Sequence, residues 1–287
     1  MKTDRGHERS TLRLAGIELD LSARTHIMGV LNVTPDSFSD GGRYLEPSRA
    51  LAHAEELIDA GADIIDVGGE STRPGSDPVP LDVELNRVTP VIRGLAGMGT
   101  RVAISIDTWK SEVAERALDL GAHVVNDISA LQFDPKLAGL ACRYKAGLVI
   151  SHIKGTPKNM QADPAYEDAV TEIRDFLAAA AAKALDAGVD RRSIVVDPGI
   201  GFGKRLEHNL AILKRLGEIA DLGYPVLIGP SRKSFIGALT GAPVNERLWG
   251  TLAAAALGVA HGASIVRVHD VKEARQALAV ADAVLRA

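Results

Sequence analysis

Eight short apolar runs, separated by stretches with helical periodicity, constrain the fold of this chain more than any other feature. A continuous apolar run is typical of a strand that is buried on both faces, as in a parallel sheet. Eight alternating strand and helix units predict an α/β protein with a closed (β/α)8 TIM barrel. The predicted strands are His26–Val33, Asp63–Gly69, Val102–Thr108, Val124–Ser129, Leu148–Ile153, Ile194–Gly201, Pro225–Ser231 and Ile265–Val271.

Each run ends in, or leads to, a polar residue able to do chemistry. The active site of a (β/α)8 barrel lies at the C-terminal ends of its strands, so these residues are expected to meet in space. In chain order they are Asn32, Asp66, Asp107, Asn126, His152, Asp197, Lys233, Arg267 and His269.

The chain divides into an N-terminal segment, residues 1–25, and one barrel domain, residues 26–287. Alternating apolar residues between Leu12 and Leu21 predict a β-hairpin that plugs the N-terminal mouth of the barrel. Three βα connections, loops 1, 2 and 5, are longer than the usual two to six residues. They are Thr34–Gly42, Glu70–Pro80 and Lys154–Pro164.

Composition excludes several classes of partner. The net charge of −4 and the pI of about 6.1 give no basic surface for nucleic acid or an anionic membrane. The longest apolar stretch, Leu252–Ala260, is shorter than the roughly 20 residues of a membrane span. One cysteine, Cys142, and no secretory signal favour a cytoplasmic location.

Asp107, Asn126 and Asp197 end three of the apolar runs. A buried carboxylate is costly unless it is paired or hydrogen-bonded. Two carboxylates and an amide at neighbouring strand ends suit a heterocycle rich in N–H donors, because a carboxylate can accept two parallel hydrogen bonds. The alternative is that these residues cap the helices that follow.

Arg267 and His269 alternate along the last strand and therefore share one face. This pair suits an anion such as a phosphate; the alternative is that Arg267 pairs with a core carboxylate. Lys233 can reach the same mouth, and Ser231 is a candidate N-cap of the next helix.

Asn32 offers a neutral oxygen at the end of the first strand. Mg²⁺ commonly takes few protein ligands beside substrate phosphates and water, so Asn32 is a candidate magnesium ligand. His152 is either a ligand contact, a base or a hydrogen-bonded core histidine, of which we favour the last.

Seven ordered motifs together resemble dihydropteroate synthase, the folate-pathway enzyme inhibited by sulfonamides. The resemblance covers the chain from about residue 25 to the end. The motifs are GVLNVTPDSFSDGG (29–42), GGESTRPG (68–75), SIDT (105–108), VNDIS (125–129), DPGIGFGK (197–204), SRKSFIG (231–237) and RVHD (267–270).

The resemblance implies a role for each matching residue. The implied pterin pocket comprises Asp107, Asn126, Asp197, Lys233 and Ile153, where Ile153 replaces a common methionine. The implied diphosphate site comprises Asn32, Thr72, Arg73, Arg267 and His269, with Mg²⁺ on Asn32. The implied p-aminobenzoate pocket comprises Phe38, Pro74, Phe202 and Ser234. Asp107, Lys233, Arg267, His269 and the loop residue Asp40 are implied to be catalytic.

The implied activity is a transferase reaction between two small-molecule substrates in a homodimeric enzyme. It joins 6-hydroxymethyl-7,8-dihydropterin diphosphate to p-aminobenzoate and releases diphosphate. Two alternatives are a pterin-dependent methyltransferase domain, which would not need Arg267 with His269, and a pterin-binding protein without catalysis.

Overall fold

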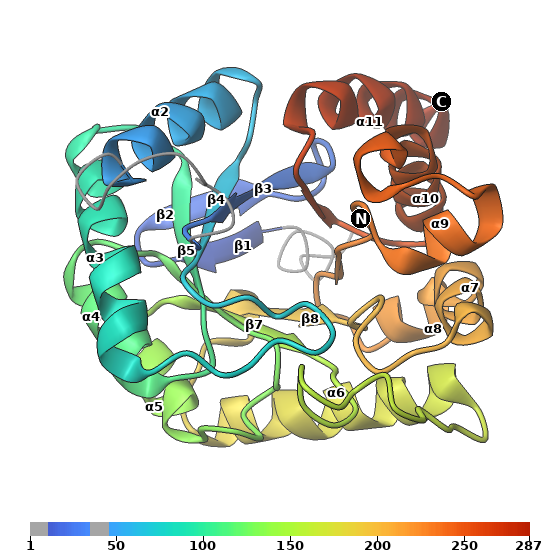
Figure 1. Cartoon of the computed structure of the whole chain (residues 1–287), viewed down its shortest axis with the longest axis horizontal. Coiled ribbons are helices and arrows are strands. Elements are labelled where there is room, and N and C mark those ends of the chain that lie inside the picture. The colour runs from blue at the N-terminus through green and yellow to red at the C-terminus, as the bar shows by residue number, and fades with distance from the viewer. Residues whose placement is uncertain (1–10, 35–45) are drawn as a thin grey trace, which may run out of the picture.

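The computed structural model describes residues 11–34 and 46–287, and in it eight parallel strands form a barrel enclosed by helices (Figure 1). Hydrogen-bonded pairing runs in the order β8-β7-β6-β5-β4-β3-β10-β9. A parallel bridge between Val196 and Val226 joins the two outer strands of this order, so the barrel closes. The predicted (β/α)8 fold is confirmed.

The barrel strands begin where the apolar runs predict, within two residues, and most end earlier. The strands are β3 His26–Asn32, β4 Ile64–Gly68, β5 Ala103–Asp107, β6 Val124–Asp127, β7 Gly147–Ser151, β8 Ile194–Asp197, β9 Leu227–Ile228 and β10 Ile265–Val268. The last residues of each run leave the ladder and form the connections above it, whereas the strands still include Asn32, Asp107, Asn126 and Asp197. β9 is shortest, since Pro230 has no N–H for a ladder.

The helices form an outer ring around the strands (Figure 1). They are α2 Glu46–Asp59, α3 Leu81–Gly97, α4 Ser111–Asp119, α5 Lys136–Tyr144, α6 Ala169–Asp186, α7 Leu206–Lys214, α8 Leu216–Ala220, α9 Ser234–Thr240, α10 Leu248–Ala260 and α11 Val271–Arg286. No helix among the described residues is long and apolar enough to cross a membrane.

An antiparallel hairpin, β1 Thr11–Leu14 and β2 Ile17–Asp20, closes the N-terminal mouth of the barrel. Leu12 and Leu14 are fully buried against one residue from each of the eight barrel strands. Gly147 at the start of β7 has no side chain where Leu14 packs: a Cβ there would lie 2.3 Å from Leu14. The plug predicted from the alternating leucines is confirmed.

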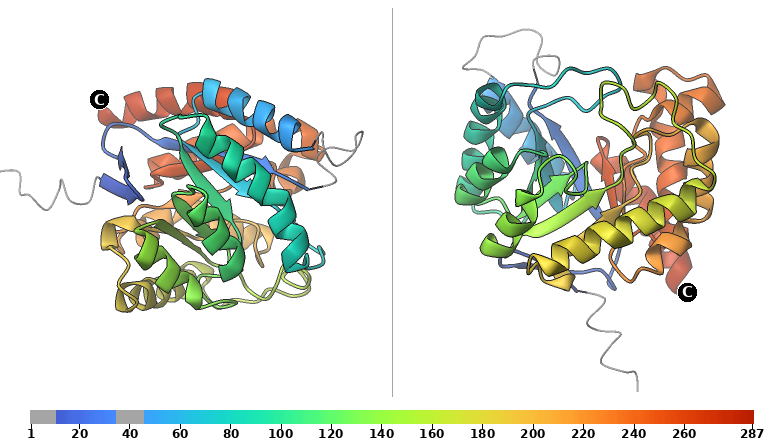
Figure 2. Two further views of the ribbon diagram at one scale, coloured as in Figure 1. Left: turned by 90° about the vertical axis from the view of Figure 1, so that its left-hand side faces the viewer. Right: turned by 90° about the horizontal axis from the view of Figure 1, so that it is seen from below.

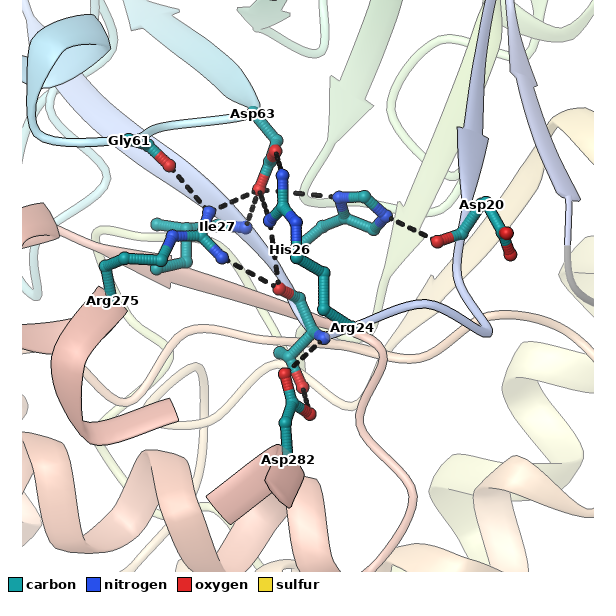
Figure 3. A network of polar contacts seen from close by, with 9 residues as sticks. Asp20, Arg24, His26, Ile27, Gly61, Asp63, Arg275 and Asp282 are labelled. Atoms are coloured by element: carbon teal, nitrogen blue, oxygen red, sulfur yellow. Dashed lines mark hydrogen bonds and ion pairs between the residues drawn. The ribbon is translucent and has the colours of Figure 1, made fainter. Parts of the chain in front are cut away.

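A polar network ties the hairpin, two strands and the last helix together at this mouth (Figure 3). Asp63 accepts hydrogen bonds from Arg24, Arg275 and the Ile27 N–H. Asp282 of α11 accepts from the Thr25 N–H and hydroxyl. Because the site lies at the other end of the strands, this network serves stability.

Loop 2 packs on loop 5 at the C-terminal end of the barrel. The Gly75 N–H donates to the Pro157 carbonyl at 2.9 Å, and Lys158 pairs with Asp77. In both side views loop 2, in cyan, lies at the opposite end from the dark-blue hairpin (Figure 2). Two long loops are thus held together over the predicted site.

Candidate active site

A cavity of about 710 Å³ lies among the C-terminal strand ends and the loops above them. It brings together ten of the residues predicted from the sequence, which come from β3, β5 and β10, from four connections and from the start of α9. They are Asn32, Thr72, Arg73, Pro74, Asp107, Phe202, Lys233, Ser234, Arg267 and His269. Phe38 and Asp40 lie outside the described residues.

Arg267 bridges two buried carboxylates in the barrel interior. Its Nε donates to Asp66 Oδ2 at 2.6 Å, and its Nη2 donates to Asp107 Oδ2 at 2.8 Å. The alternative reading, that Arg267 pairs with core carboxylates, is therefore correct, yet Arg267 also lines the cavity. Asp107 does not cap α4, whose N-cap residue is Lys110, so the capping alternative is wrong for Asp107.

Asn126, Asp197 and Ile153 are buried and do not line the cavity. Asn126 Nδ2 donates to Asp66 Oδ2 at 2.9 Å. Asp197 accepts from the Gly199 N–H at 2.7 Å and from the Ser151 hydroxyl. These predicted residues therefore lie near the lining residues without being part of the open cavity.

Ile153 belongs to a small buried apolar cluster that also contains Ile128 and Met160, with Phe202 and Trp109 packed against it. Met160 and Phe202 both line the cavity. Ile153 therefore lies in an apolar cluster next to the cavity, and its part in a pterin pocket stays a prediction.

Lys233 lines the cavity and packs on Phe202. Its Nζ lies 3.9 Å from the centre of the Phe202 ring, a cation–π contact. Gly201 makes room for it, since a Cβ there would lie 2.9 Å from Lys233 Cδ. Gly199 and Gly203 likewise allow close approach, to the His152 and Lys154 carbonyls. The three glycines thus serve close packing between two loops.

His269 is oriented by Ser231, which sequence reasoning assigned differently. The Ser231 hydroxyl lies 2.9 Å from His269 Nδ1 and accepts from the His269 N–H at 3.3 Å. The prediction that Ser231 caps the next helix is wrong, because α9 begins at Ser234 after Lys233 and has no side-chain cap. Since its hydroxyl already accepts from the backbone, its proton is free to point to Nδ1, which favours the N–H on Nε2.

Burial shifts the pKa of three groups in the cavity, Asp107, Lys233 and His269. It raises the pKa of the Asp107 carboxyl to about 7, although the charge of Arg267 works in the opposite direction. It lowers the pKa of Lys233 to about 8, aided by Arg267 and opposed by Asp197 and Asp107. Burial and the positive charge of Arg267 lower the pKa of His269 to about 3, so this ring is neutral near pH 7.

Loop 2, which carries Thr72, Arg73 and Pro74, is anchored at both ends by a buried ionic cluster. Glu70 accepts from the Val79 N–H at 2.9 Å, and Lys110 donates to Glu70 and to the fully buried Glu84. The ion pairs and hydrogen bonds of Glu70, Lys110 and Glu84 offset the cost of burying their charges, and they hold both ends of loop 2 in place.

The oxygen atoms around Asn32 suit a hard cation that is held mainly by other ligands. Gly68 has no side chain, and a Cβ there would lie 3.6 Å from both Asn32 Oδ1 and Asp107 Oδ2. No group of three His, Cys, Asp or Glu residues able to hold a metal occurs in the described ranges. One amide oxygen beside a carboxylate fits Mg²⁺ bound chiefly through phosphate and water oxygens.

Two side chains outside the cavity have purely internal partners. His152 Nδ1 lies 2.9 Å from Lys204 Nζ, and its ring packs edge-on against Phe176, as expected for a core histidine. Asp127 accepts from the N–H groups of Ser129 and Leu131, so its role is structural.

Asp66 and Ser231 are functional candidates whose contacts were not predicted from the sequence, since Asp66 was given no role and Ser231 was predicted to cap a helix. Asp66 carries a signal, a lone charge within the run Ile64–Gly68. Ser231 carries none, because its partner is 38 residues away.

Comparison with known proteins agrees with this geometry. A family model described as pterin binding enzyme matches residues 28–269. A dihydropteroate synthase of Synechocystis is 46% identical to this chain, and the match covers 93% of this chain and 92% of the length of the relative.

Solved structures give the same result. A dihydropteroate synthase of Yersinia pestis in complex with a sulfonamide drug has a TM-score of 0.90, 42% identity, and coverage of 96% of this chain and 100% of its own. One from Xanthomonas albilineans with 4-aminobenzoic acid has a TM-score of 0.90 and 42% identity, covering 97% and 99%.

The match of the family model to residues 28–269 of this (β/α)8 barrel identifies a pterin-binding enzyme. The chain belongs to this family and, within it, to the dihydropteroate synthases. Its activity is that of a transferase in folate biosynthesis.

Proposed function

We propose that the chain condenses 6-hydroxymethyl-7,8-dihydropterin diphosphate with p-aminobenzoate by a dissociative displacement, in which diphosphate leaves before the aniline nitrogen attacks. The observation that carries this mechanism is the single cavity lined by Asp107 and Lys233 together with Arg73, Arg267 and His269. Carboxylate and cation partners for a heterocycle therefore adjoin a set of anion-binding side chains.

The heterocycle is assigned to the inner end of the site. Asp107, Asn126, Asp197 and Lys233 would hold its donor-rich edge and ring nitrogens, and Ile153 would form an apolar wall beside it. The charge on Asp107 would stabilise positive charge as it develops on the pterin methylene carbon. Because the cation is the electrophile, no nucleophilic side chain is needed.

The departing diphosphate is assigned to Asn32, Thr72, Arg73, Arg267 and His269. Arginine binds phosphate oxygens in a fixed planar geometry, and the neutral His269 ring can donate one hydrogen bond through Nε2. Donors that already face the place where charge develops need no rearrangement during the reaction.

Mg²⁺ would be held by Asn32 and the diphosphate oxygens. When bound, it supplies a positive charge that stabilises the leaving group. The neutral amide oxygen of Asn32 and its place beside Asp107 support this assignment.

p-Aminobenzoate is assigned to the outer part of the cavity. Pro74, Phe202 and Ser234 would line its pocket, and Phe38 and Asp40 of loop 1 would complete it. The aniline nitrogen needs positioning more than deprotonation, since its lone pair attacks the carbon directly and the proton leaves afterwards.

The decisive experiment is a turnover assay with both substrates and Mg²⁺. Release of diphosphate together with 7,8-dihydropteroate is expected. Methyl transfer from methyltetrahydrofolate without diphosphate release would instead support the methyltransferase alternative.

Two copies of the chain would associate through the last three helices. Large apolar side chains are exposed there, among them Trp249 at 76%, Leu257 at 56% and Val284 at 71%. Helices α9, α10 and α11 lie side by side (Figure 1), so their exposed side chains can form a continuous surface. A Val284→Glu variant should sediment as a monomer, whereas Leu185→Glu on α6 should not change the mass.

We also assign the enzyme to the cytoplasm, without nucleic-acid partners. The single cysteine supports the cytoplasmic assignment. The net charge of −4 supports the absence of nucleic-acid partners. Cell fractionation tests the first, and an electrophoretic shift assay with nonspecific DNA tests the second.

A further inference from the structure

Asp66 lies in the middle of β4 and is fully buried. Its Oδ2 accepts two hydrogen bonds, from Arg267 Nε at 2.6 Å and from Asn126 Nδ2 at 2.9 Å. Its other oxygen, Oδ1, has no partner among the described residues. Both hydrogen bonds that the Asp66 carboxylate accepts therefore come from side chains of other strands, Arg267 of β10 and Asn126 of β6.

Those two side chains belong to different halves of the proposed site. Asn126 is assigned to the pterin, and Arg267 is assigned to the diphosphate. No other side chain of the described residues is hydrogen-bonded to both of them. One oxygen atom on β4 therefore fixes the orientation of both.

Each partner has limited alternatives. Among the described residues, Asn126 makes no other side-chain hydrogen bond, and Arg267 otherwise bonds only to Asp107. Asp107 is itself assigned to the pterin, so an arginine held by Asp107 alone would follow that carboxylate when substrate binds. A second, fixed carboxylate keeps the guanidinium in place independently of the ligand.

We propose that Asp66 is a positioning residue of the reaction, which couples the pterin pocket to the diphosphate site by holding Asn126 and Arg267 through one carboxylate oxygen. This rests on the proposed assignment of those two residues. Asp66 touches neither substrate; it acts through its two partners.

Two substitutions separate this role from a structural one. Asp66→Asn keeps the shape, and its amide oxygen can replace Oδ2 as a neutral, weaker acceptor. Asp66→Leu fills similar space without any acceptor, and it should lower the stability of the fold because Arg267 then keeps only Asp107 as its carboxylate partner. The matched control is Asp63→Asn, near the other end of the same strand, which breaks arginine pairs away from the cavity.

We expect a graded kinetic effect. Asp66→Asn should lower kcat/KM for the pterin substrate about 10-fold and Asp66→Leu at least 100-fold, with the KM for p-aminobenzoate unchanged. Asp63→Asn should lower the midpoint of thermal unfolding and leave kcat and both KM values within about twofold, since it is remote from the cavity.

Calorimetric titration separates this proposal from the proposed function. The probes are 6-hydroxymethyl-7,8-dihydropterin, and inorganic diphosphate with Mg²⁺. If the original protein binds neither probe, the proposed function fails; if it binds both, each should bind at least 10-fold more weakly to Asp66→Leu. Unchanged affinities in that variant, or wild-type turnover by it, would overturn the positioning role. Should Asp66→Leu not fold, Asp66→Asn with kinetics indistinguishable from those of Asp63→Asn would overturn it.

Discussion

Replacing Arg267 by methionine tests both the charge balance of the barrel interior and the proposed diphosphate site. Methionine keeps an apolar stem and removes a guanidinium that bonds to Asp66 at 2.6 Å and Asp107 at 2.8 Å. Breaking a buried ion pair by removing one partner costs about 3–5 kcal/mol, because a buried charge is left uncompensated. We expect a loss of about 3 kcal/mol in the free energy of unfolding at pH 8.

This loss should depend on pH, and the sign follows from Asp107. In the original protein the folded-state pKa of Asp107 is raised to about 7, and removing Arg267 raises it further. Below pH 7 both folded proteins carry the proton, so the difference in stability between them is constant. Above pH 7 only the folded variant keeps the Asp107 proton. The free energy of unfolding of the variant therefore falls by about 1.4 kcal/mol per pH unit relative to that of the original protein.

Urea unfolding of both proteins at pH 6, 7 and 8, followed by tryptophan fluorescence, measures the difference. The control is Arg275→Met, which also removes an arginine from a buried carboxylate. Its partner Asp63 has a pKa lowered far below neutrality, against the effect of burial, by His26 and Arg24. The control difference should therefore be flat from pH 6 to 8. A flat difference for Arg267→Met as well would refute the reasoning. Turnover by Arg267→Met should fall by 100-fold or more, from loss of about 3 kcal/mol of transition-state stabilisation.

Three further outcomes are expected. The value of kcat/KM should rise with pH through about 7, as Asp107 ionises, and fall above about 8, as Lys233 loses its proton. The variant Lys233→Arg should remove the fall at high pH. An unchanged fall would exclude Lys233 as its origin. A sulfonamide should raise the KM for p-aminobenzoate at constant kcat if both occupy the pocket beside Phe202, whereas a fall in kcat alone would contradict that pocket. Leu14→Ala should lower the free energy of unfolding by about 3 kcal/mol, because it opens a cavity in the hairpin plug, without changing kcat at 25 °C; a kcat loss without a stability loss would show that the plug does not act through packing.

Much of the fold could be predicted because barrel strands and helices have periodicities that are local in sequence. The predicted strands all begin within two residues of the observed ones. The hairpin plug followed from alternation alone. Strand ends were placed too late, since the last residues of each run belong to the connections, whereas polar residues such as Asn32, Asp107 and Asp197 still lie in the ladder.

Side-chain pairing across the barrel could not be predicted to the same degree. Asp66 and Arg267 are 201 residues apart, and nothing in either run specifies that they meet. Ser231 was assigned to a helix cap because its neighbours in sequence suggest one. Its actual partner, His269, follows strand β10 and is close because β10 pairs directly with β9 in the barrel.

The sequence by itself determined which residues stand at strand ends, and therefore which residue types face one another at the mouth of the barrel. This follows from two local rules, the spacing of apolar residues and the placing of strand ends in a parallel barrel. Only the tertiary structure decided which donor meets which acceptor. Hydrogen bonds depend on distances of a few tenths of an ångström between side chains of different strands, and those distances are fixed by how the closed barrel packs. Asp66 illustrates the difference: its position in β4 was evident from the sequence, but its link between Asn126 and Arg267 exists only in the folded barrel.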